Sequence, residues 1–147
     1  MSRGFVKWIL PALAFLLAGT AVLAQVEAPP SCQLCGMDRT AFAQSRMLII
    51  YTGGETVGTC SLNCAVAEMK RHTAKQVKAL MVGDYRTEKL LDARAATWVV
   101  GGKFPGVMTS LAKWAFDSRA AAEQFINENG GTLVSFDECL QLALREH

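Results

Sequence analysis

Two pairs of adjacent glycines, Gly53-Gly54 and Gly101-Gly102, constrain the fold of this 147-residue chain more than any other feature. Each pair follows a run rich in β-branched and aromatic residues, and tandem glycines accept the positive φ that tight hairpin turns demand. The predicted strands around the two turns are residues 46–52 and 56–60, then 95–100 and 111–116. Two hairpins in corresponding places indicate a unit that occurs twice in the chain.

A helix and one further strand are predicted after each hairpin. Ser61 can cap a helix that runs to about His72, and Asp117 or Ser118 can cap a second one. Glycines after Asn129 end the second helix, because glycine best accepts the left-handed conformation there. The remaining predicted elements are strands 77–82 and 132–136 and a final helix over 138–145. We therefore predict an α+β fold of two small strand-strand-helix-strand (ββαβ) units with antiparallel sheets, plus an N-terminal signal helix and a C-terminal helix.

The first 24 residues are typical of a secretory signal peptide. Arg3 and Lys7 form a short basic region, residues 8–23 are mostly apolar, and small residues at the end of this stretch predict cleavage before Gln25. We expect export to the periplasm, with an uncleaved membrane anchor through residues 5–24 as the alternative. The predicted organisation is a signal peptide at 1–24, a linker at 25–31, a first unit at 32–90 and a second at 91–147.

Charge and motif content exclude several classes of function. All 13 acidic residues lie beyond residue 24, and removing Arg3 and Lys7 from the 15 basic residues leaves 13, so the exported chain has a net charge of about zero. Nucleic-acid binding relies on excess positive charge, so nucleic acid is not an expected partner. The sequence also has no Ser-His-Asp set, no glycine-rich phosphate loop and no spaced carboxylate pair. We therefore expect a binding protein and not an enzyme.

Sulfur-containing residues carry the chemistry of the first unit. Cys32 and Cys35 have the C-x-x-C spacing that lets two sulfurs converge, and Met37 follows after one glycine. Cys60 and Cys64 lie four residues apart at the predicted start of a helix, so one turn places them on the same side. Thiolates with a thioether suit a soft ion such as Cu(I) better than a hard one. We predict a Cu(I) site from these five residues.

Other interpretations of these residues stay open at this point. Four cysteines on two turns could form a structural zinc site, a C-x-x-C pair could be a redox dithiol, and the pairs could form disulfides. Met37 could fill a gap in the core, and Cys60 and Cys64 could be small buried apolar residues. Cys139, on an apolar face of the last helix, is predicted to be a buried free thiol. Met108 lies in a Pro/Gly loop, where a functional role is more plausible than in a strand.

Several ordered motifs resemble the NosL family, the accessory proteins of nitrous oxide reductase. These are Cys32-Gln33-Leu34-Cys35-Gly36-Met37, the two glycine-rich hairpins, the segment 91–96, Pro105-Gly106-Val107-Met108, and Gly130-Gly131 with Phe136-Asp137-Glu138. The resemblance covers about residues 32–140.

The resemblance implies an exported metallochaperone that holds Cu(I) on sulfur and helps load a copper enzyme, either directly or through a membrane copper-transfer complex. It also implies two small ββαβ units, and it assigns ligand roles to Cys35, Met37 and Met108. The chain departs from the family pattern in two ways. It has no clear lipid-attachment motif, and Thr109-Ser110 stand where the family loop usually continues Gly-His. The Cys60 and Cys64 pair is found in only part of the family and could supply the missing ligands or mark a different cargo.

Overall fold

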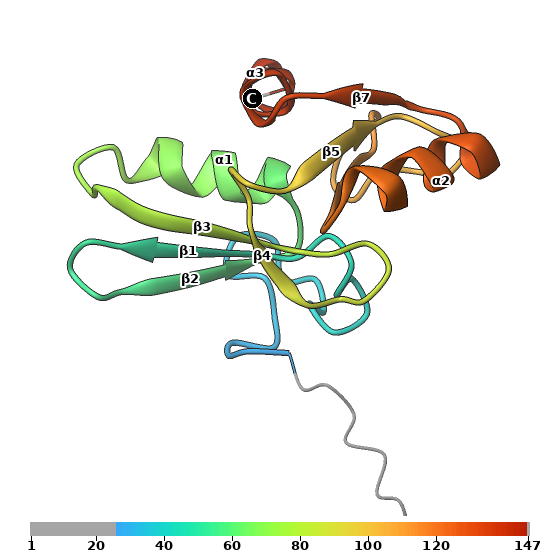
Figure 1. Cartoon of the computed structure of the whole chain (residues 1–147). Helices are drawn as coiled ribbons and strands as arrows, with labels where there is room; N and C mark the ends of the chain where they lie inside the picture. The colour runs from blue at the N-terminus through green and yellow to red at the C-terminus, as the bar shows by residue number, and fades with distance from the viewer. Residues whose placement is uncertain (1–25, 147) are drawn as a thin grey trace, which may run out of the picture.

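The computed structural model describes residues 26–146, and the predicted signal helix and cleavage site therefore lie outside the described residues. Within this part of the chain, two antiparallel sheets and three helices form a mixed α+β fold, as the sequence predicted (Figure 1). No helix among residues 26–146 is long and apolar enough to cross a membrane.

The first sheet contains four strands in the order β2-β1-β3-β4. Their bounds are β1 Met47–Tyr51, β2 Thr56–Thr59, β3 Val77–Gly83 and β4 Leu90–Asp92. Helix α1, Leu62–Arg71, lies between β2 and β3 in the chain, and the Ser61 side chain caps it by accepting a hydrogen bond from the Cys64 amide. The predicted hairpin and the predicted helix cap are both confirmed.

The second sheet contains three strands in the order β6-β5-β7. Their bounds are β5 Thr97–Val100, β6 Lys113–Phe116 and β7 Thr132–Val134, with helix α2, Arg119–Asn129, between β6 and β7. Ser118 is the N-cap of α2, and Gly130, with φ of 76°, ends it. The elements of each half therefore follow the expected ββαβ order along the chain, and β4 is an additional strand in the first sheet.

Helix α3, Phe136–Arg145, connects the two halves of the molecule. It follows β7 but contacts α1 as well as β5, and Figure 1 shows it beside both. The largest core cluster accordingly contains residues of both sheets and of α3, among them Met47, Trp98 and Cys139. An isolated parallel bridge between Asp84 and Ala115 further joins the sheets. The two repeated patterns therefore share this core cluster.

The structure differs from the predicted elements at several boundaries, and β7 ends at Val134 and not at residue 136. The joining segment 83–94 contains a short strand, β4, which pairs with β3 and crosses the boundary predicted at residue 90. Strands β5 and β6 begin two residues later than predicted, because a turn precedes β5 and a bent loop precedes β6. Helix α3 begins at Phe136 and not at Glu138, since Ser135 and Glu138 form a capping box. The division of the chain into two units remains a prediction.

Candidate metal centre

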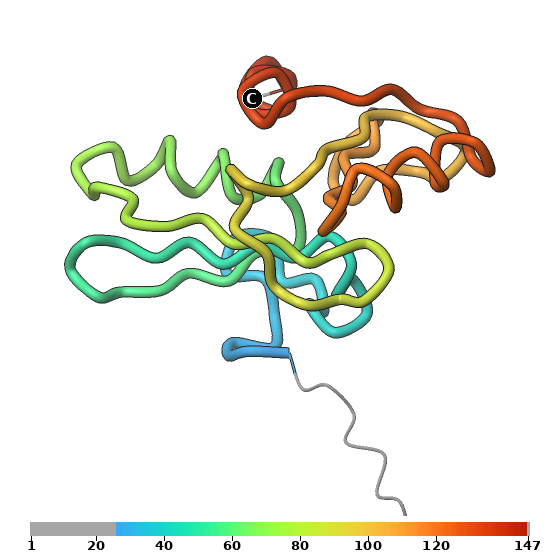
Figure 2. Tube along the Cα trace, viewed as in Figure 1, coloured from blue at the N-terminus to red at the C-terminus, as the bar shows by residue number. Residues whose placement is uncertain are grey.

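Four cysteines converge on one point, between the loop 32–37 and the start of α1. The Sγ atoms of Cys32, Cys35, Cys60 and Cys64 all lie within 4.8 Å of one another. Figure 2 shows how the blue and cyan N-terminal part of the fold comes back toward the first sheet and α1. All four thiols are free, so no disulfide joins them in this structure.

Three of the four sulfurs form a nearly equilateral triangle. The Sγ atoms of Cys35 and Cys60 are 3.6 Å apart, those of Cys60 and Cys64 are 3.7 Å apart, and those of Cys64 and Cys35 are 3.8 Å apart. The centre of such a triangle lies about 2.1 Å from each corner, close to the zinc–thiolate bond length of about 2.3 Å. The fold alone therefore holds three thiols at nearly the separations that a shared soft ion requires.

The loop owes its shape to its own backbone. The amide of Cys32 donates to the carbonyl of Met37 at 2.7 Å, and the amide of Gly36 donates to the carbonyl of Cys32 at 2.8 Å. Gly36 has φ of 80°, a conformation that a residue with a side chain rarely adopts. This tight turn brings Cys32 and Cys35 to the same side, as the C-x-x-C-G spacing requires.

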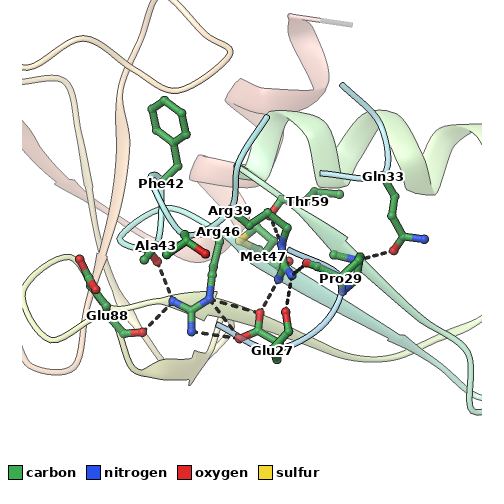
Figure 3. Close-up of polar contacts among 12 residues, drawn as sticks. Glu27, Pro29, Gln33, Arg39, Phe42, Ala43, Arg46, Met47, Thr59 and Glu88 are labelled. Atoms are coloured by element: carbon green, nitrogen blue, oxygen red, sulfur yellow. Dashed lines mark hydrogen bonds and ion pairs between the residues drawn. The ribbon is translucent and has the colours of Figure 1, made fainter. Parts of the chain in front are cut away.

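A buried ion-pair network fixes the loop against the first sheet (Figure 3). Arg39 is fully buried, and its guanidinium donates to the carbonyls of Thr59 and Met47 and pairs with the Glu27 carboxylate. Arg46 pairs with the same carboxylate at 3.0 Å. Because Glu27 precedes the loop and Arg39 follows it, both ends of the loop are attached to β1 and β2.

Burial differs sharply among the four thiols. Cys32, Cys60 and Cys64 have exposed fractions of 3%, 0% and 2%, whereas Cys35 is exposed. The three buried sulfurs belong to an apolar cluster that includes Trp114. The centre therefore has an apolar interior and one accessible thiol, so Cys35 marks the side from which an ion or a partner's ligand could approach.

The surroundings shift the pKa values of the thiols in opposite directions. Burial raises the pKa of Cys32, but hydrogen bonds from the backbone of Cys35, Leu34 and Cys60 and from the Cys35 side chain together lower it, and the resulting pKa is about 7. Burial raises the pKa of Cys35 to about 11, and the Cys32 and Cys60 thiols act in the same direction. Hydrogen bonding to Cys64, together with burial, raises the pKa of Cys60 well above its usual range. A cation entering this centre must therefore displace protons.

The structure places the two candidate methionines differently. The Sδ of Met37 lies 3.9 Å from the Sγ of Cys60, and its side chain packs on the same apolar cluster, so it contacts both the core and the sulfurs. Met108 is half exposed. No sulfur contact joins Met108 to the four thiols within residues 26–146, although its neighbour Val107 packs in their cluster. The structure thus brings five of the six candidate ligands together.

Several supporting residues were missed by the sequence-based reasoning. Arg39 and Lys113 are buried charges and Glu27 is a half-buried one, yet nothing in their spacing distinguishes them from solvated residues. By contrast, the predicted buried free thiol at Cys139 is confirmed, since it is 0% exposed and burial raises its pKa to about 12.

Comparisons with known proteins agree with this architecture. The NosL family model matches residues 23–143, most of the chain. The crystal structure of the copper chaperone NosL from Shewanella denitrificans matches with a TM-score of 0.61 and 25% sequence identity, covering 79% of this chain and 94% of that chain. A comparison with curated proteins found no match. The family match over residues 23–143, on the fold described above, shows that this chain belongs to the NosL family.

Proposed function

We propose that this protein is an exported Cu(I) carrier, a metallochaperone that binds one ion on its cysteine cluster and passes it to a copper-handling partner. The observation that carries this proposal is the convergence of four thiols, one of them exposed, from the loop and the start of α1. Thiolate and thioether ligands favour Cu(I) over hard cations. Membership of the NosL family and the likeness to a copper chaperone support the same function.

The proposed binding mode uses the sulfur triangle of Cys35, Cys60 and Cys64. The ion takes the centre of the triangle, and Cys32 lies within 4.8 Å as a fourth sulfur. Binding converts thiols to thiolates and releases protons, so affinity rises with pH. Met37 needs no deprotonation and serves as a weaker, adjacent ligand.

Transfer to a partner proceeds by ligand exchange from the exposed side. Because Cys35 is the accessible thiol, an incoming sulfur of the partner reaches the ion beside it, and the Cu–Cys35 bond breaks before the bonds to the buried sulfurs. Met108, exposed on the neighbouring loop, is the ligand that the ion meets outside the triangle. The protein thus carries the ion without changing it, which is the role of a carrier and not of an enzyme.

The proposed destination and location are supported by the family membership and by the sequence of residues 1–24. The partner is a copper enzyme under assembly, with nitrous oxide reductase the first candidate, or a membrane copper-transfer complex that serves it. Residues 1–24 direct the chain to the periplasm, and if they are not cleaved, residues 5–24 attach it to the membrane. Nucleic acid is not expected as a partner.

A zinc-stapled interaction module is the second candidate, and one observation favours it. The contacts of 3.6, 3.7 and 3.8 Å among three thiols are near the sulfur–sulfur separation of about 3.8 Å in a tetrahedral zinc site with bonds of about 2.3 Å. A structural zinc ion supplies folding free energy, so its removal would unfold the domain. A carrier, in contrast, remains folded when empty.

The decisive experiment is a Cu(I) competition titration against a chromophoric chelator. It uses reduced protein from residue 25 onward, which contains every described helix and strand, together with Cys60→Ser and the matched control Cys139→Ala. We expect one tightly bound Cu(I) per chain in the wild type and the control, strong weakening in Cys60→Ser, and a folded apo form by circular dichroism. Weak Cu(I) binding with zinc-dependent folding would instead favour the zinc module.

A further inference from the structure

Lys113, the first residue of β6, places a buried ammonium group among the start of α1, the end of α3 and the loop that precedes β6. Its side chain is only 2% exposed. The Nζ lies 3.1 Å from each of four acceptors: the Asn63 Oδ1, the Thr109 Oγ1, the Leu111 carbonyl and the Glu146 Oε1. A buried ammonium is costly unless it is paired, and here Glu146 neutralises it. The hydrogen bonds of this buried ammonium therefore link the segments of the chain that carry its acceptors.

The partners of Lys113 come from three separate parts of the chain. Asn63 lies in the first turn of α1, directly before Cys64. Thr109 follows Met108 in the loop between β5 and β6, and Glu146 is the C-cap of α3. Glu146 also accepts from the Thr109 hydroxyl at 2.6 Å and from the Asn63 side-chain amide. The network therefore links the helix turn that carries Cys64 to the loop that carries Met108.

The backbone at Met108 adopts a conformation that needs such support. Met108 has φ of 55°, in the left-handed region that residues other than glycine rarely occupy. On one side, Val107 is buried in the same apolar cluster as Cys60 and Cys64, and on the other side Thr109 is held by Lys113. Met108 itself is 50% exposed. The loop is thus fixed on both sides of an exposed thioether, and strain that the surroundings maintain is a feature of functional sites.

We propose that Lys113 is a positioning residue for copper transfer, acting through Thr109 to hold Met108 at the edge of the cysteine cluster. This inference rests on the proposed carrier function. With the network intact, Met108 stays exposed beside Val107, which packs in the cluster of Cys60 and Cys64, and it can receive an ion that leaves the sulfur triangle. Without it, the loop relaxes, Met108 departs from its left-handed conformation, and the ion has no outer ligand.

A double-mutant cycle on the transfer rate distinguishes positioning from general structural support. The protein is loaded with Cu(I), and the rate of transfer to bathocuproine disulfonate is measured for the wild type, Met108→Leu, Lys113→Met and the double variant. Contacting or jointly acting residues show non-additive effects, and we expect each single change to slow transfer by about tenfold. In the double variant, Lys113→Met should add no further slowing. Independent slowing by the two changes would overturn the proposal.

Two further variants control for folding and for charge. Thr109→Val removes one hydroxyl but leaves the Lys113–Glu146 pair, and it should slow transfer in the same Met108-dependent way if Lys113→Met does not fold. Lys103→Met removes an exposed lysine of the same loop and should leave the rate unchanged. Normal Cu(I) loading with equal transfer rates in all variants would overturn this proposal alone. Failure of the wild type to load Cu(I) would overturn the proposed function as well.

Discussion

Replacing Gly58 by alanine tests whether buried Arg39 supports the sulfur loop as described. Gly58 lies in β2, two residues before Cys60, and the Arg39 guanidinium packs against it. A Cβ at this position would stand 2.6 Å from the Arg39 Cζ and 2.6 Å from its Nη1. No stable contact is that short, so the guanidinium must move away from the strand.

The cost follows from what Arg39 would lose. Its donors are occupied by the carbonyls of Glu27, Pro29, Thr59 and Met47 and by the Glu27 carboxylate. Breaking a buried, hydrogen-bonded ion pair typically costs about 3–5 kcal/mol. An unstrained glycine-to-alanine change gains about 0.4–1 kcal/mol through the unfolded chain. We therefore expect Gly58→Ala to lower the free energy of unfolding by about 2–4 kcal/mol, which corresponds to about 10 °C in melting temperature.

Urea unfolding followed by far-UV circular dichroism measures this cost, with Gly53→Ala as the matched control. Gly53 lies in the first hairpin turn, and a Cβ there would meet nothing within 4 Å. The same Gly58→Ala change should cost much less in an Arg39→Met background, because no guanidinium then has to be displaced. Equal stability of Gly58→Ala and Gly53→Ala would refute the reasoning.

Three further results are expected. Trp98→Phe should lower the free energy of unfolding by about 1–3 kcal/mol, because the Ala93 carbonyl loses its buried indole donor at 2.8 Å; an unchanged urea midpoint would contradict this. Cys139, whose pKa burial raises to about 12, should react with a disulfide reagent at neutral pH only after unfolding, which mass spectrometry can check. Burial raises the pKa of Glu27, but Arg46, a backbone hydrogen bond and the Arg39 charge together lower it to below its ordinary value of 4.5. Its contribution is therefore complete above that value and is lost as pH falls through the lower folded pKa. Acid titration of stability should show a smaller loss in Glu27→Gln.

Local signals in the sequence were sufficient for most of the secondary structure. The tandem glycines marked the first hairpin turn, and Ser61 and Gly130 marked a helix start and a helix end, because each acts through its own backbone or a neighbour three or four residues away. Strand β4 was missed, since Leu90–Asp92 contains no β-branched residue and exists only through its pairing with β3. The true start of α3 was visible in the Ser135 and Glu138 spacing.

The sequence was sufficient to predict which cysteines form the candidate metal centre, but not how the two pairs meet. Spacing alone paired Cys32 with Cys35 and Cys60 with Cys64, as both pairs lie within a single turn of chain. The meeting of the two pairs depends on how the loop docks on the first sheet. That docking depends on Arg39, which in the sequence is one charged residue among many. Long-range contacts of this kind have no local pattern from which to infer them.

The sulfur contacts between Cys35, Cys60 and Cys64 enclose the whole β1–β2 hairpin. An ion bound there cross-links two segments that lie 25 residues apart and binds the folded chain in preference to the unfolded one. Mass action then raises the free energy of unfolding by about 4 kcal/mol when the free ion exceeds its dissociation constant a thousandfold. Thermal stability consequently reports metal occupancy, and a carrier that has delivered its ion becomes the less stable, more readily degraded form.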